Sequence, residues 1–244
     1  MDIIIQEIDQ LIQQIEEERE LHEQNTRRMR TRLEHIQRWM KNENQAISRA
    51  IIRRTEEART TEQKSIARNE AAVKKHKLWL EENYVQVYTD GSCINNPEEP
   101  NRKLAGIGVF FNPRNRHNTC MKVLGEQTNI RGEIMAIIQA IRIAAKLQVT
   151  RLKINTDSEL TIRTVEEYIP RWEENEWKTS QGRAIQNLEL ILQLRNTIKR
   201  LEGKLEVSFR FIKAHVGHFG NEEADKLAKN GCKAEEVWKE AEEC

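Results

Sequence analysis

Glycine and proline are missing from the first 90 residues of this 244-residue chain. All ten glycines lie at or after Gly91, and all four prolines lie at or after Pro97. Because these two residues punctuate the turns of compact domains, their absence excludes an ordinary loop-connected domain in this stretch. We therefore predict two parts of different character, an arm over residues 1–84 and a folded domain that begins at residue 85.

The chain also has almost no net charge, and it lacks a long apolar run and paired cysteines. It has 40 Lys and Arg against 39 Asp and Glu, so nucleic-acid binding cannot be argued from its overall charge of +1. No run of about 18 apolar residues is present, so we expect no membrane partner. The four cysteines have no zinc-ligand spacing, and no secretory signal accompanies them, which predicts reduced thiols inside the cell. The acid-rich start is unlike a transit peptide, so we expect the nucleus or cytoplasm rather than the mitochondrion.

The arm has the composition of a long helix, because Glu, Gln, Arg, Ile and Leu lose little rotamer freedom in one. Its apolar residues follow the 4-3-4 spacing of a coiled-coil seam, which changes phase near Asn25–Thr26, where we expect a stutter or a break. The seam consists of Ile4, Ile8, Leu11 and Ile15, and then of Met29, Leu33, Ile36, Met40 and Ile47.

We interpret residues 4–52 as an oligomerising helix that forms a homodimer. Residues 53–84 have few apolar side chains and are predicted to be a charged linker, helical or partly disordered. A solvated single helix and an antiparallel hairpin are the alternatives, and the spacing does not choose between parallel and antiparallel pairing. The basic cluster Arg27-Arg28-Met29-Arg30 is interpreted as a solvated helix face.

After residue 84 the pattern becomes that of an α/β domain. Val85, Val87 and Thr89 alternate with polar residues, which predicts a strand ending at Asp90-Gly91-Ser92. Two more strands, residues 105–111 and 119–124, complete an antiparallel meander. Helices and strands then alternate, which predicts a mixed sheet with helices on its faces, followed by a short charged tail, residues 233–244. The later elements are a helix over residues 131–146, a strand over 152–156, helices from Glu159 and over 186–201, a strand over 205–212, and a helix from Asn221.

Four carboxylates occupy prominent positions in this pattern. Asp90 and Asp157 each follow a predicted strand end, Glu133 falls in the first turn of its helix, and Asp225 falls in the first turns of the last helix. Each alone is explained by a turn, a cap or a helix dipole. If they converge, they repel one another unless cations lie between them. Oxygen ligands suit Mg²⁺ or Mn²⁺ and not zinc, so the set predicts a two-metal phosphodiester site.

Residues 85–232 carry motifs that resemble those of the type 1 ribonuclease H domain. These motifs are the segments 88–93, 129–133, 155–158 and 215–225. The resemblance implies the ribonuclease-H-like fold and cleavage of the RNA strand of RNA–DNA hybrids, leaving 5′-phosphate and 3′-hydroxyl ends. It also implies two Mg²⁺ ions, for which Mn²⁺ can substitute, held by Asp90, Glu133, Asp157 and Asp225.

The same resemblance suggests roles for other residues. It makes His215 a mobile residue that shuttles protons or helps to release product, whereas His218 shapes the loop. It places Tyr168 and Trp172 beside the DNA strand, and Thr128 and Asn187 in a pocket for a DNA phosphate. The residues it places along the minor groove of the hybrid are Gly91, Ser92, Cys93, Asn96, Gln127 and Asn129.

The sequence departs from the family pattern at two points. Glu126 stands where the phosphate pocket has an arginine, and the usually basic protrusion carries Glu173, Glu174 and Glu176. We expect weaker hybrid binding, offset by avidity if the arm dimerises. A catalytically quiet module with the ribonuclease H fold, which binds nucleic acid or protein, is the alternative function, and a retroelement origin of the domain stays open.

Overall fold

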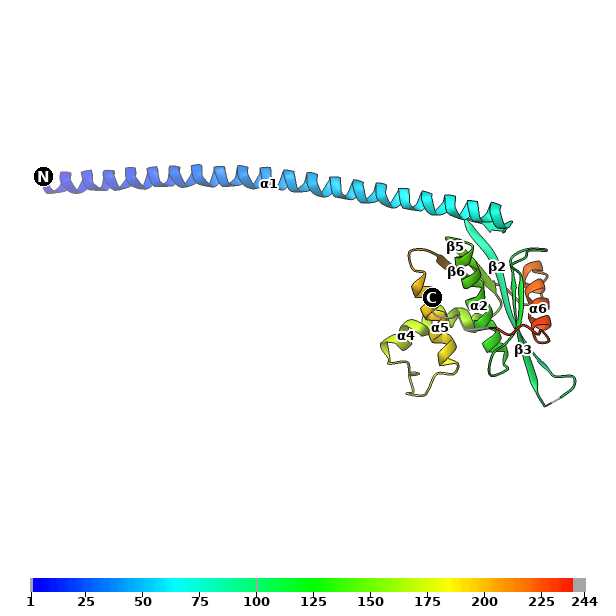
Figure 1. Ribbon diagram of the computed structural model, residues 1–244. Helices are drawn as coiled ribbons and strands as arrows, with labels where there is room; N and C mark the ends of the chain where they lie inside the picture. Colours follow the sequence, from blue (N-terminus) through cyan, green and yellow to red (C-terminus); the bar gives the residue numbers. More distant parts are fainter. Residues whose placement is uncertain (1, 100, 239–244) are drawn as a thin grey trace. The chain divides into compact units, whose positions relative to one another are not determined.

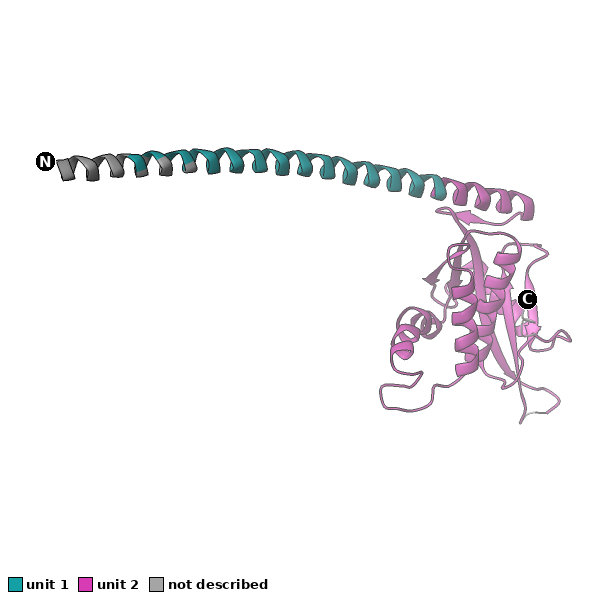
Figure 2. Ribbon diagram, turned by 60° about the vertical axis from the view of Figure 1, so that its left-hand side comes forward, with its two compact units in different colours: residues 1–61 teal, residues 62–244 magenta. Residues whose placement is uncertain are grey.

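The computed structural model describes residues 2–99 and 101–238, and most side chains before His22 are not among those described. The chain forms two compact units, residues 1–61 and residues 62–244, coloured separately in Figure 2. None of the helices within the described ranges is long and apolar enough to cross a membrane.

One uninterrupted helix, α1 (Asp2–His76), makes up unit 1 and continues into unit 2. Of the stutter or break expected at Asn25–Thr26, the break does not occur, because the helix passes through these residues and Thr26 Oγ1 donates to the carbonyl of His22 at 2.9 Å, one turn back. Disorder in residues 53–76 is also excluded, because the helix continues there. With neither glycine nor proline in the segment, nothing in the sequence interrupts the backbone hydrogen bonds.

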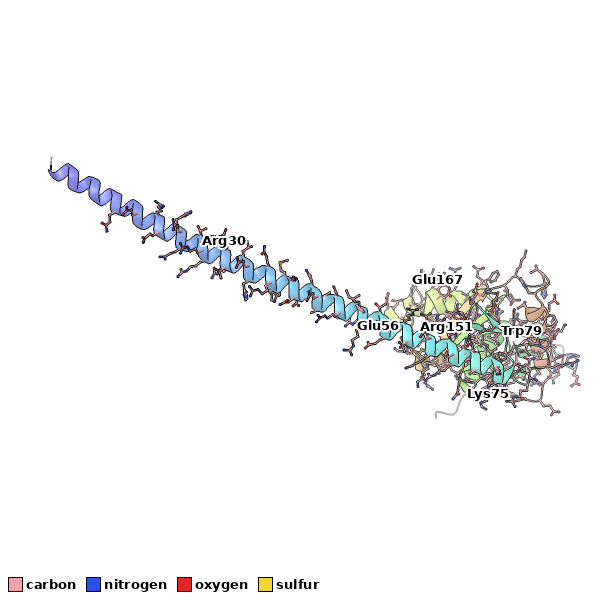
Figure 3. All side chains as sticks on the ribbon, turned by 90° about the horizontal axis from the view of Figure 1, so that it is seen from above. Arg30, Glu56, Lys75, Trp79, Arg151 and Glu167 are labelled. Atoms are coloured by element: carbon pink, nitrogen blue, oxygen red, sulfur yellow. The ribbon has the colours of Figure 1, made fainter. Side chains whose placement is uncertain are left out.

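The described side chains of unit 1 project from all sides of the helix, as Figure 3 shows around Arg30 and Glu56. The second block of the seam is exposed to between 51% and 70%, at Met29, Leu33, Ile36, Met40 and Ile47. The side chains of the first block, Ile4, Ile8, Leu11 and Ile15, lie outside the described residues.

Unit 2 is built on the predicted mixed sheet, which confirms the fold class. The strand order is β4-β3-β2-β5-β6, with β1 paired to β2. β2 pairs antiparallel with β3, and β3 with β4, whereas β5 runs parallel to both β2 and β6. The strands are β1 (Leu80–Glu81), β2 (Tyr84–Asn95), β3 (Lys103–Phe110), β4 (Thr119–Lys122), β5 (Arg151–Thr156) and β6 (Glu206–Phe211).

Helices cover both faces of this sheet, with α2 on one face and α6 on the other (Figure 1). The predicted helix from Glu159 consists of three joined segments, including a π-helical turn labelled η1. The helices of unit 2 after α1 are α2 (Asn129–Lys146), α3 (Glu159–Arg163), η1 (Thr164–Tyr168), α4 (Ile169–Glu174), α5 (Leu188–Arg200) and α6 (Phe219–Gly231).

Glycines let both covering helices approach the sheet closely. A Cβ at Gly91 of β2 would lie 2.3 Å from the backbone nitrogen of Glu133 in α2. A Cβ at Gly108 of β3 would lie 2.0 Å from the carbonyl oxygen of Ala224 in α6. Real Cβ atoms do not approach backbone this closely, so both positions require glycine. The two contacts bring Glu133 and Asp225 toward the strands that carry the other carboxylates.

The compact unit begins at Glu62, 23 residues before the predicted start of the domain. The buried Asn69 side chain donates to the carbonyl of Asn83 at 2.7 Å and accepts from the backbone N–H of Thr150 at 3.2 Å. Ala72 and Leu78 are each 5% exposed and join the core. The end of α1 is therefore part of the folded domain rather than a linker to it.

The segment after α6 also belongs to the fold. Val237 forms a parallel bridge with Lys122 of β4, and Trp238 is 1% exposed, with the Arg142 guanidinium 4.8 Å from the centre of its ring. The predicted charged tail, residues 233–244, thus includes residues that cover the edge of β4. Residues 239–244 lie outside the described residues.

Candidate active site

Two of the four carboxylates lie side by side because of strand register. In the parallel pair of β2 and β5, Tyr88 faces Asn155, so Asp90 and Asp157 each follow the last register pair by two residues. Adjacent strands lie about 4.8 Å apart, which sets the spacing of the two backbones. Asp90 is not past a strand end as predicted, because β2 continues to Asn95 in its pairing with β3.

Glu133 reaches the same region from α2. Thr128 caps this helix by accepting from the backbone N–H of Arg131, so Glu133 lies in the second turn and not in the first as predicted. Its carboxylate accepts from Ser158 Oγ at 2.5 Å and from Thr161 Oγ1 at 3.4 Å. These hydroxyls belong to the N-terminus of α3, directly after Asp157, and they tie α2 to the end of β5.

Asp225 comes from the second turn of α6. Lys229 Nζ lies 2.6 Å from its carboxylate, one helical turn along. On the same helix, Asn221 Nδ2 donates to Asp157 Oδ2 at 2.9 Å. α6 therefore contributes one acid and one amide to the group, and the amide fixes the direction of the Asp157 side chain.

The electrostatics of Asp90 show that the acids influence one another. Burial, followed by the negative charges of Asp157 and Asp225, raises the pKa of Asp90 to about 7. The backbone N–H of Gly91, which donates to Asp90 Oδ1 at 2.8 Å, opposes this rise in pKa. Burial also raises the pKa of Glu133, against the hydrogen bond from Ser158. Such crowding of carboxylates is a frequent mark of a functional site.

The donor set fits a hard divalent cation, because it offers carboxylate oxygens whose mutual repulsion a positive charge would relieve. Among the described residues, no three His, Cys, Asp or Glu side chains converge tightly enough to form a metal cage. Three of the acids instead contact other side chains: Asp225 contacts Lys229, Asp157 contacts Asn221, and Glu133 contacts Ser158. Coordination by all four acids therefore requires these side chains to turn toward a common centre.

The two histidines of the β6–α6 loop are exposed. His215 has a left-handed backbone conformation, with φ of 55°. His218 is the N-cap residue of α6, but its side chain makes no capping bond in the described structure. The predicted mobile residue is therefore placed on the loop that leads into the helix of Asp225.

Arg131 links the two residues of the predicted phosphate pocket, and sequence reasoning missed this role. Its guanidinium donates to Asn187 Oδ1 at 3.1 Å, pairs with Glu189 and also reaches the Leu124 carbonyl at 3.3 Å. Its backbone N–H bonds to Thr128. Arg131 is 9% exposed, and the three partners of its guanidinium stabilise the buried charge; neither its burial nor these partners can be read from the sequence.

Tyr168 and Trp172 pack against each other with ring centres 5.5 Å apart and their planes tilted by 41°. Together with Asn187 they border a cavity of about 270 Å³, whose other walls include Ile130 and Leu160. The predicted aromatic residues and one residue of the predicted phosphate pocket thus share one depression of the surface.

The predicted minor-groove residues are placed unequally. The Gln127 amide is committed to the backbone, since it accepts from Ala105 N at 2.8 Å and donates to the carbonyls of Val123 and Gly125. The Asn96 side chain accepts from the backbone N–H of Glu98. Gly91 and Ser92 are buried, Cys93 is half-buried and donates to the Gln127 carbonyl, and Asn129 is exposed.

A model of one protein family, RNase H, matches residues 82–233, more than half of the chain. The chain belongs to the RNase H family. This result confirms the resemblance to type 1 ribonuclease H on which the site residues were assigned. The match begins where β1 ends, so the arm and most of the docked segment 62–84 lie outside it.

Several curated proteins are similar to this chain over the domain. Human ribonuclease H1 is 38% identical over 153 residues, which cover 63% of this chain and 51% of that protein. Ribonuclease H of Schizosaccharomyces pombe is 36% identical, with coverage of 59% and 52%. Ribonuclease H of Actinobacillus pleuropneumoniae is 32% identical, with coverage of 60% and 89%. The chain thus spans about half the length of the eukaryotic relatives.

Solved structures agree on the fold. The solution structure of the PFV RNase H domain has a TM-score of 0.51 at 23% identity, covering 61% of this chain and 93% of that domain. A foamy viral protease-reverse transcriptase in complex with dsDNA has a TM-score of 0.50 at 25% identity, covering 60% and 92%. We use both as support for the mixed-sheet architecture.

Proposed function

We propose that this protein is an endoribonuclease that cleaves the RNA strand of RNA–DNA hybrids and leaves 5′-phosphate and 3′-hydroxyl ends. The observation that carries the proposal is the register of β2 and β5, which sets Asp90 beside Asp157, together with the raised pKa of Asp90. Glu133 and Asp225 complete the acidic set from helices on opposite faces of the sheet. Membership of the RNase H family supports the same activity.

Asp90, Glu133, Asp157 and Asp225 are the residues proposed to hold two Mg²⁺ ions. When bound, the ions supply an activated water for in-line attack and charge stabilisation of the leaving 3′-oxygen. Asn221 orients Asp157 through its amide, and Ser158 does the same for Glu133. His215, on its exposed loop, is proposed to move a proton at its imidazole or to assist product release.

The hybrid is proposed to be recognised by shape and by the 2′-hydroxyl groups of its RNA strand, since the activity does not read sequence. Asn129 and the Gly91–Cys93 backbone are proposed to face the minor groove, and Tyr168 and Trp172 to contact the DNA strand. A foamy viral protease-reverse transcriptase has been solved with an RNA/DNA hybrid, and the part of it that shares this fold makes up 20% of its chain, which supports this substrate class.

The acidic protrusion is less unfavourable to phosphates than its sequence suggests. Glu173 is paired with Arg195, and Glu176 lies 3.5 Å from Lys178 Nζ. Of the three acids, Glu174 is the one for which no such pair is described. We therefore propose a modest reduction in the affinity of the isolated domain for hybrids, visible mainly at low salt.

Self-association of the arm through residues 4–52 is the second part of the proposal. Its support is the row of exposed apolar side chains between Met29 and Ile47, which has the spacing of a coiled-coil seam. A monomeric mass in light scattering at tens of micromolar protein would remove this part without affecting the nuclease proposal.

The catalytic proposal is tested with a labelled RNA–DNA hybrid, with and without Mg²⁺, using the Asp157→Asn variant as a control. We expect Mg²⁺-dependent cleavage of the RNA strand alone, and its loss in the variant. If the wild type cleaves no faster than the variant, the alternative function is favoured, in which the domain binds nucleic acid or protein without catalysis.

A further inference from the structure

The arm divides into two blocks of opposite charge. Residues 1–24 contain eight acids and one arginine, a net charge of −7, whereas residues 25–54 contain nine Lys and Arg and two acids, a net charge of +7. α1 is one continuous helix, so the two blocks follow one another along its axis and cannot fold together. Their centres lie about 40 Å apart at about 1.5 Å per residue, several Debye lengths at physiological salt. Apart from the Arg27–Glu23 pair at their boundary, the two blocks of one arm therefore do not offset each other, whereas the oppositely charged block of a second molecule can.

The seam of the arm is symmetric about Asn25–Thr26. When the polar positions Glu18, His22 and Glu43 are included, it advances by 4-3-4-3-4 from residue 4 to residue 22, and by the same steps from residue 29 to residue 47. When a second arm is aligned antiparallel to the first, the seam positions of one block lie opposite those of the other block. The facing pairs are Ile4 and Ile47, Leu11 and Met40, and Ile15 and Ile36. The change of phase at Asn25–Thr26, which does not break the helix, then coincides with a two-fold axis.

We propose that two copies of the arm pair as an antiparallel coiled coil over residues 4–47, with the acidic block of each copy against the basic block of the other. This proposal rests on the self-association argued above and adds its orientation, register and electrostatic cause. The occupant of the exposed seam of each arm is therefore the arm of a second copy.

The polar residues in the seam favour antiparallel over parallel pairing. Antiparallel pairing sets Glu18 opposite Leu33 and Glu43 opposite Ile8. Parallel pairing in register sets Glu18 against Glu18 and Glu43 against Glu43, and also faces like-charged blocks along the whole arm. Like charges held at such distances repel, and the repulsion is strongest where water is excluded.

Nucleic acid is the competing occupant, because the basic block could attract phosphates. The exposed apolar seam argues against it, since phosphates offer no burial for Leu33 at 57% exposure or Ile36 at 52%. The acidic block on the same helix would also repel a nucleic acid that extends along the arm.

Charge reversal in the full chain tests the pairing. One variant is Glu16→Lys/Glu17→Lys/Glu20→Lys, and the other is Arg28→Glu/Arg30→Glu/Arg32→Glu. We expect each variant alone to associate at least tenfold more weakly than the wild type in analytical ultracentrifugation, and an equimolar mixture to recover the affinity. Glu56→Lys/Glu57→Lys, on the same helix beyond both blocks, should change nothing. Added salt should weaken the wild-type dimer, whereas it would strengthen a parallel one.

Cross-linking tests orientation and register. Chains carrying Leu11→Cys are mixed with chains carrying Met40→Cys, oxidised mildly, and the linked peptides are identified by mass spectrometry. We expect a disulfide between position 11 of one copy and position 40 of the other. Links between two copies of position 11 or two of position 40 would overturn the antiparallel arrangement and leave self-association intact.

Two other outcomes overturn the proposal. A monomeric wild type at tens of micromolar removes both the orientation and the self-association. The basic block would be assigned to nucleic acid by a different result. In that case the chain binds hybrid in a salt-sensitive way, charge reversal at Arg28, Arg30 and Arg32 abolishes this binding, and the mass of the protein in solution does not change. Hybrid cleavage by every arm variant should stay at the wild-type rate under saturating substrate, which keeps this test separate from the catalytic proposal.

Discussion

Replacement of Asp90 by asparagine should stabilise the metal-free protein. Asp90 is 9% exposed, and burial together with Asp157 and Asp225 raises its pKa from 3.8 to about 7. Asparagine keeps the shape and keeps an oxygen that can accept the Gly91 N–H, while it removes the charge. The variant therefore isolates the free-energy cost of the ionised carboxylate.

The sign and size of the effect follow from proton linkage. A carboxyl group whose pKa is higher in the folded than in the unfolded state loses stability as pH rises from 3.8 to about 7, and bears the full cost above that range. At about 1.4 kcal/mol per pH unit, the cost reaches about 4 kcal/mol as an upper bound. Because the neighbouring acids titrate with Asp90, we expect the Asp90→Asn variant to gain about 2–4 kcal/mol at pH 8 and almost nothing near pH 4.

Urea unfolding in EDTA at pH 4, 6 and 8 measures this difference, and Glu98→Gln, an exposed carboxylate, is the control. Mg²⁺ should stabilise the wild type more than Asp90→Asn, because binding to the folded state alone raises its stability by mass action. If the variant unfolds at the same or a lower urea concentration than the wild type at pH 8, the acids are not crowded and the electrostatic argument for the site fails.

Three further substitutions test how the domain is assembled, all by urea unfolding. Asn69→Ala should cost about 2–3 kcal/mol, because it removes two part-buried hydrogen bonds to the backbone of residues 83 and 150; a cost below 1 kcal/mol would mean that the end of α1 is not docked. Trp238→Ala should cost about 3–5 kcal/mol, which distinguishes a packed terminus from a solvated tail. Gly108→Ala should cost about 3 kcal/mol and also slow hybrid cleavage, because it pushes α6 away from β3; unchanged cleavage would argue that the placement of α6 does not matter for the reaction.

The acidic site could be predicted from the sequence because each acid stands at a position that the chain pattern marks. Period-2 alternation ends at Asp90 and at Asp157, and parallel register then makes the two acids neighbours. The position of Asp90 inside a strand, rather than after its end, could not be predicted. β2 stops pairing with β5 after Tyr88 but continues to pair with β3 as far as Asn95. A single strand with two different partners gives one hydrophobic pattern, and that pattern does not show where either pairing stops.

The docked segments escaped prediction because their few buried residues do not form a periodic apolar pattern. The end of α1 is held by Asn69 and Ala72, which in sequence are indistinguishable from a solvated helix face. Trp238 follows a charged stretch after the last glycine, and its burial depends on the edge of β4 and on Arg142, far away in sequence. Both cases depend on tertiary partners that no local periodicity encodes.

The absence of glycine and proline before residue 91 has two structural consequences that the sequence alone did not separate. It allows α1 to pass the phase change at Asn25–Thr26 without a break, so the two charged blocks follow one another on a single helix axis. It also allows the same helix to continue past Thr61 into the compact unit, where Asn69 bonds to the start of β5. A glycine placed at residue 60–62 would cost the helix only about 1 kcal/mol. Helix stability alone therefore does not explain why this boundary has neither glycine nor proline.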